Sequence, residues 1–132
     1  MAGPTVVAIV NTNPDMVELL KARVEAAGFI VLVLHVAEIR QGLDIETTMT
    51  QHDPKVIVYD VVAPYERSWR FLEHLRTDTS FAGRHFVLTS PNVRNLRKLV
   101  GVDEQVYEIL GGDDVDGIVQ AVREASRARP TR

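Results

Sequence analysis

Five short apolar runs, each followed by a segment with helical spacing of apolar residues, set the pattern of this chain. The runs are rich in Val, Ile and Leu and are bounded by Pro, Gly, Asn or Asp. Such runs are typical of strands buried on both faces of a parallel sheet. The expected strands are residues 6–10, 29–34, 55–60, 86–88 and 106–110. Five alternating units with right-handed crossovers predict an α/β fold with a doubly wound, five-stranded parallel sheet.

Helix signals separate these strands. Asn13 and Pro14 predict the N-cap and first residue of a helix that ends at Gly28. Residues 38–51 have weaker periodicity, and Gly42 lowers the helix propensity there, but we expect one helix. Further helices are expected after Pro64, over residues 93–100, and after Asp113 or Asp114. The result is a flavodoxin-like topology with strand order 2-1-3-4-5 and five helices, in which a crevice lies at strands one and three.

Composition narrows the classes of function. The chain has 132 residues, 45% of them hydrophobic, a net charge of −3 and no cysteine. We expect one domain over residues 1–132, with a core of about 5–126 and a frayed basic C-terminal tail. The lack of cysteine excludes disulfides and thiolate catalysis. The charge gives no reason to expect nucleic acid, and no apolar run is long enough for a membrane span, so we expect a cytoplasmic protein.

Asp60 is the most informative residue, because it ends an apolar strand opened by Pro54. In open α/β sheets, reactive groups gather outside the carboxyl ends of the strands, so this carboxylate should face the crevice. Asn11 follows the first strand and should face it too. The alternative is that Asp60 caps the following turn. The same topology suits domains that bind a flavin or cobalamin, so the fold alone does not choose a function.

Three motifs give the chain a resemblance to a known family. The third strand ends in Asp60 with Pro64 four positions later, the fourth ends in Thr89, and Asn13-Pro14 follows the first. These features resemble the receiver domain of bacterial response regulators, over nearly the whole chain. The resemblance implies that Asp60 is the phosphoacceptor of a two-component system and that Thr89 contacts the phosphoryl group.

The chain departs from that family where the chemistry takes place. The family binds magnesium with two acidic residues after the first strand, and Asn11 and Thr12 occupy those positions. Magnesium prefers carboxylate oxygens, so Asp60 alone implies a weak or absent metal site, and we expect no other cofactor. The family also ends strand five with a lysine, where this chain has Leu110 and Gly111. Without that cation the phosphoryl oxygens lose stabilisation.

Two residues have a second interpretation. Tyr107 lies three positions before Leu110, the spacing at which the family carries an aromatic switch residue, but a half-buried strand aromatic would look the same. The Asp60 carboxylate could simply hydrogen-bond to Asn11, Thr12 or Thr89 and accept no phosphoryl group.

These features predict a divergent, stand-alone, receiver-like signalling module that is not an enzyme. The resemblance implies a protein partner, either a histidine kinase or a downstream signalling protein. The expected surface is residues 93–100, 106–110 and 115–125, with Arg94, Arg97 and Lys98 as a basic edge; a homodimer is the alternative occupant. Two rival functions stay open: a regular response regulator phosphorylated on Asp60, and a domain that binds a small ligand in the crevice.

Overall fold

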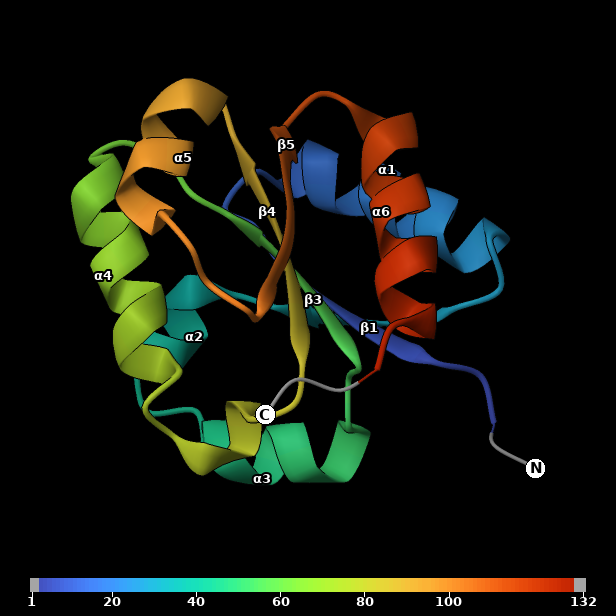
Figure 1. Ribbon diagram of the computed structural model, residues 1–132. Coiled ribbons are helices and arrows are strands. Elements are labelled where there is room, and N and C mark those ends of the chain that lie inside the picture. The colour runs from blue at the N-terminus through green and yellow to red at the C-terminus, as the bar shows by residue number, and fades with distance from the viewer. Residues whose placement is uncertain (1–2, 130–132) are drawn as a thin grey trace.

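Five parallel strands form one sheet in the order β2-β1-β3-β4-β5, which confirms the predicted topology (Figure 1). The computed structural model describes residues 3–129. Its strands are β1 (Val6–Val10), β2 (Ile30–Leu34), β3 (Val56–Asp60), β4 (His85–Ser90) and β5 (Val106–Gly111). Because the strands are parallel, their carboxyl ends meet at one edge of the sheet.

The described residues form six α-helices, one more than predicted. They are α1 (Pro14–Ala26), α2 (Val36–Arg40), α3 (Ile45–His52), α4 (Tyr65–Leu75), α5 (Val93–Val100) and α6 (Val115–Arg127), with a 3-10 turn at Thr79–Phe81. The single helix expected over residues 38–51 is wrong, because this segment is divided into α2 and α3. Gly42 has φ +104°, which a helix cannot contain, and the Asp44 side chain then caps α3 by accepting from Thr47 N.

The helices cover both faces of the sheet. Helices α1 and α6 lie on one face, and α2, α4 and α5 lie on the other (Figure 1). Alternate residues of each strand point to opposite faces, so the central strands are apolar on both sides. One core contains Val7, Ile9, Val58, Leu20 and Ile118, and the other contains Ala8, Ile57, Phe86, Trp69 and Leu96. Within residues 3–129, no helix has the length and apolar character needed to cross a bilayer.

The C-terminal segment is ordered further than its composition indicates. Helix α6 begins after Asp114, whose side chain accepts from Gly117 N, and it continues to Arg127. Beyond it, His85 Nε2 donates to the carbonyl of Arg129 at 2.7 Å. The last residues of the predicted frayed tail, 130–132, lie outside the described part of the chain.

Arg76 joins the end of α4 to the loop before β5. Its guanidinium donates to both carboxylate oxygens of Asp103, at 3.0 and 2.7 Å. It also stacks over the rings of Trp69 and Phe86, at 5.1 and 5.6 Å from their centroids. The hydrogen bonds from Arg76 lower the pKa of Asp103, against the opposing effect of burial. This cluster holds the C-terminal end of α4 against the loop that precedes β5.

Candidate functional site

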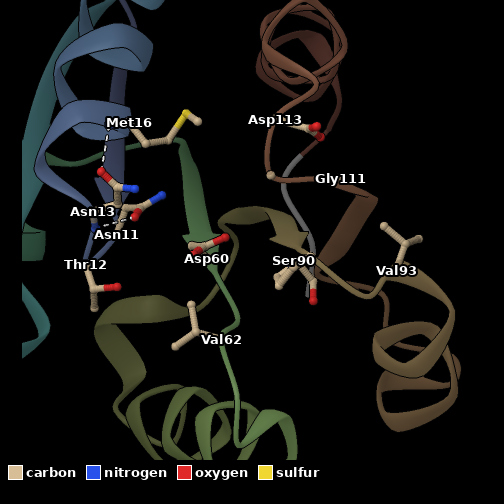
Figure 2. A pocket seen from close by; sticks show the side chains of 12 residues that line it. Asn11, Thr12, Asn13, Met16, Asp60, Val62, Ser90, Val93, Gly111 and Asp113 are labelled. Carbon is tan, nitrogen blue, oxygen red and sulfur yellow. Dashed lines mark hydrogen bonds between the residues drawn. The ribbon is translucent and has the colours of Figure 1, made fainter.

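A crevice of about 580 Å³ opens at the carboxyl ends of the strands. Figure 2 shows Asp60 in its centre, between the turn that follows β1 and the loop that follows β5. Of the residues predicted for the pocket, Asn11, Thr12, Asp60 and Gly111 line this crevice. Sequence reasoning did not assign the other lining residues to it: Asn13, Met16, Val62, Ser90, Pro91, Val93, Gly112 and Asp113.

Asp60 is half-buried and has one side-chain hydrogen-bond partner among the described residues. Thr89, which lies opposite it on β4, donates its hydroxyl to Asp60 Oδ1 at 2.6 Å. Burial raises the pKa of Asp60 above its ordinary value, and the Thr89 hydrogen bond partly offsets the rise. No Lys, Arg or His within residues 3–129 lies close enough to form a salt bridge with this carboxylate. The charge of Asp60 is therefore not compensated by a side chain.

Asn11 has a structural task in the turn after β1. Its side chain is buried, and its Oδ1 accepts the backbone N–H of Asn13 at 2.8 Å. Asn13 in turn caps α1 by accepting from the N–H groups of Asp15 and Met16 (Figure 2). Thr12 is exposed beside them. The amide oxygen that could face a cation is thus already occupied by the turn.

The donor set of the crevice does not fit a magnesium site of the kind the resemblance implies. Such a site needs several hard oxygens in near-octahedral arrangement, including one or two carboxylates. Asp60 supplies one carboxylate at the centre, Asp113 lies at the rim, and Asn11 is engaged in its turn. Across residues 3–129, no group of three or more His, Cys, Asp or Glu side chains is arranged to hold a metal ion.

The loop after β5 closes the crevice with backbone. Leu110 turns away from the crevice and packs against the apolar cluster on the α1 and α6 side. Gly112 lies so near Asp60 that an added Cβ would be 3.5 Å from Asp60 Oδ1. Asp114 caps α6, which leaves Asp113 exposed at the rim of the crevice. This side of the crevice therefore contributes a carboxylate and no cation.

Tyr107 does not join the other pocket residues. The pairing of β4 and β5 shifts register between Phe86 and Val87, so Tyr107 lies at a bulge near the start of both strands. Its hydroxyl donates to Glu124 on α6 at 3.3 Å, and its ring lies edge-on to His85, 6.0 Å away between centroids. Thr89 lies near the opposite end of β4, three residues and about 10 Å beyond Phe86 at the usual rise per residue.

The predicted partner surface is formed by α5, β5 and α6. Arg94, Arg97 and Lys98 are exposed on α5. Arg97 is tied to β5, because it donates to the carbonyl of Ile109 at 3.2 Å and lies 3.8 Å from the Glu108 carboxylate. Arg94 and Lys98 have no carboxylate within 4 Å in the described part of the chain. They are the charges on α5 that a partner could meet.

Among the comparisons with known proteins, the one with solved structures finds similar folds. No family model matches the sequence, and no curated protein sequence matches it either. Among solved structures, a response regulator from Thermotoga maritima is 16% identical, with 95% of this chain and 99% of that chain covered at a TM-score of 0.71.

Two further structures show the same likeness. The chemotaxis response regulator CheY4 of Vibrio cholerae is 14% identical, covering 92% of this chain and 98% of its own, at a TM-score of 0.66. A response regulator protein from Burkholderia multivorans is 17% identical, covering 97% and 99%, at a TM-score of 0.64. At these identities the likeness is one of architecture. The chain has the fold of response regulator receiver domains.

Proposed function

We propose that the protein is a receiver-like signalling module that works through contacts with other proteins, without phosphoryl transfer to Asp60. One observation carries this proposal: the Asp60 carboxylate has a hydroxyl partner in Thr89, and no Lys, Arg or His among residues 3–129 lies within 4 Å of it. Phosphoryl transfer depends on positive charge that stabilises the phosphoryl oxygens. The fold and the position of Asp60 support the receiver-like character, and the altered surroundings of Asp60 support independence from phosphorylation.

A small phosphodonor tests this proposal directly. The protein is incubated with acetyl phosphate and magnesium, and its intact mass is measured, with Asp60→Asn as the control. We expect no stable phosphoryl adduct on the wild-type chain, because neither a tightly bound metal nor a lysine is available to support transfer. An adduct that forms on the wild type and is absent from Asp60→Asn would make the protein a regular phosphoacceptor.

The α5-β5-α6 surface is the proposed contact with a partner. The exposed cations Arg94 and Lys98 favour an acidic surface on that partner, because opposite charges steer and orient association. Charge reversal of both residues should abolish binding of the cognate signalling protein. The control is Lys21→Glu on α1, a helix on the face of the sheet opposite to α5. Equal loss in the control would place the contact elsewhere.

A regular response regulator is the second candidate. Thr89 lies next to Asp60 on the neighbouring strand, where its hydroxyl could contact a phosphoryl group as the resemblance implies. This function requires that magnesium and a phosphodonor suffice without the lysine. The mass measurement above separates the two candidates.

A further inference from the structure

A second hollow lies on the other side of Asp60, between α2 and the beginning of α4. Its volume is about 260 Å³, below the ~300–1,000 Å³ of sites for drug-sized ligands. It shares Thr12, Asp60 and Val62 with the larger crevice. Its remaining walls come from the ends of α2 and β3 and from the first two turns of α4. The hollow is therefore the right size for a small molecule or ion.

Two arginines line this hollow, Arg40 at the end of α2 and Arg67 in the first turn of α4. Neither has an Asp or Glu within 4 Å in the described part of the chain, whereas Arg23, Arg70, Arg76, Arg84 and Arg97 each do. The Arg40 guanidinium lies 4.9 Å from the centroid of the Phe71 ring, which orients it. The lining of the hollow contains these two cations and one carboxylate, that of Asp60, so its net charge is positive and favours an anion.

The floor of the hollow offers polar groups. Tyr59 is 3% exposed, yet it lines this space together with Ser68. Burial raises the pKa of Tyr59, while a hydrogen bond with Ser68 and the positive charge of Arg40 act in the opposite direction. Helix α4 begins at Tyr65 after Pro64, which provides no side-chain cap, and its positive end adds to the charge of Arg67.

We propose that this hollow binds a small oxyanion of the phosphate class, held without a covalent bond by Arg40 and Arg67 next to Asp60. Guanidinium groups present paired N–H donors that match the oxygens of phosphate. The Asp60 carboxylate borders the same space and opposes the anion when it is charged. Through this site the protein would respond to a free phosphate compound by reversible binding, without phosphoryl transfer to Asp60.

Inorganic phosphate is the probe for the test. It is titrated into the full chain at constant ionic strength, and backbone amide spectra are recorded. We expect saturable binding with a millimolar dissociation constant and shifts confined to residues 36–40 and 62–71. Arg40→Gln and Arg67→Gln should each weaken binding at least fivefold. Arg70→Gln is the matched control, because Arg70 lies on the same helix, pairs with Glu66 and does not line the hollow.

Asp60→Asn distinguishes a free anion from a phosphoryl group bonded to Asp60. A free anion should bind Asp60→Asn more tightly than the wild type, because one repelling charge has been removed. Loss of binding in Asp60→Asn would overturn the proposal and assign the anion to the carboxylate itself. Failure to saturate, or equal weakening by Arg70→Gln, would also overturn it. Unchanged thermal unfolding of the exposed arginine variants verifies that they are folded.

Discussion

Asp60 has a carboxylate whose burial is not offset by a cation, and this determines how its removal should affect stability. Because burial raises its pKa, the folded state binds a proton more tightly than the unfolded state does. Stability therefore falls as the pH rises from the ordinary carboxyl range through the raised pKa, and the full cost is present at neutral pH.

We predict that Asp60→Asn is more stable than the wild type at neutral pH by roughly 0.5–1 kcal/mol, a modest figure because solvent screens this half-buried group. The amide can still accept from Thr89. The advantage should shrink as the pH falls towards the ordinary Asp pKa of about 4 and disappear at about pH 3, where the wild-type carboxyl is largely neutral in both states. Urea denaturation of both proteins at neutral and at low pH measures this difference in the free energy of unfolding. Asp44→Asn should instead be less stable than the wild type at neutral pH, and the difference should shrink at low pH, because hydrogen bonds from Thr47 lower the pKa of Asp44. If Asp60→Asn is less stable than the wild type at neutral pH, a group that stabilises the Asp60 carboxylate has not been identified.

Arg76 is expected to have a larger effect on stability than Asp60. Arg76→Ala removes both bonds to Asp103 and the stacking on Trp69 and Phe86, and it leaves a partly buried carboxylate unpaired. We expect a loss of about 2–3 kcal/mol in the free energy of unfolding, measured by urea denaturation followed by circular dichroism. Arg70→Ala, which breaks an exposed pair with Glu66, should cost less than about 0.5 kcal/mol. Similar losses in the two variants would refute the role given to Arg76.

At the scale of elements, the start of α6 couples a cap to a glycine. Asp114 accepts from Gly117 N at 3.0 Å, and a Cβ added at Gly117 would overlap the Asp114 carboxylate. Gly117→Ala should therefore lose the cap, at about 1 kcal/mol, while gaining about 0.5–1 kcal/mol of helix propensity. In an Asp114→Ala background only the gain remains, so the same change should stabilise. A double-mutant cycle measures the coupling, and additive effects would contradict it.

The elements also show what sequence reasoning can reach. The strands and their order followed from apolar runs at regular intervals, and the approach of Thr89 to Asp60 followed from the parallel pairing of β3 with β4. The break at Gly42 was missed because one glycine with positive φ looks the same in sequence as a tolerated helix glycine.

Two features of the candidate site depend on tertiary arrangement. The bulge between β4 and β5 turns Tyr107 toward α6. The position of Tyr107 was predicted from its spacing of three residues before Leu110, and that spacing does not reveal a bulge. The hollow with Arg40 and Arg67 needs α2 and α4 to lie side by side. The sequence gives no indication that Arg40 on α2 and Arg67 on α4 border the same hollow.

At the scale of the whole molecule, a receiver switches when its modified Asp makes contacts that differ between two conformations. Here Asp60 has Thr89 as a contact and no lysine, so the difference should fall short of the several kcal/mol that invert a population. We predict that beryllofluoride with magnesium leaves the amide spectrum of α5 and β5 unchanged, and that magnesium alone shows no submillimolar binding by Trp69 fluorescence. Large shifts at Thr89 and along Val93–Val100 would demonstrate a working switch.

The loop after β5 has a consequence for how such a molecule could evolve. A lysine at Leu110 would have to leave the apolar cluster against α6, and one at Gly111 would start 3.2 Å from the Asp113 carboxylate. A lysine at Gly112 would begin 3.5 Å from Asp60, too near for its long stem to bring the ammonium group back to that carboxylate. A lysine at any of these positions therefore meets an obstacle, and a well-placed cation beside Asp60 would be favoured by concerted changes in the loop. The crevice should therefore keep its acidic character while single changes accumulate in the loop.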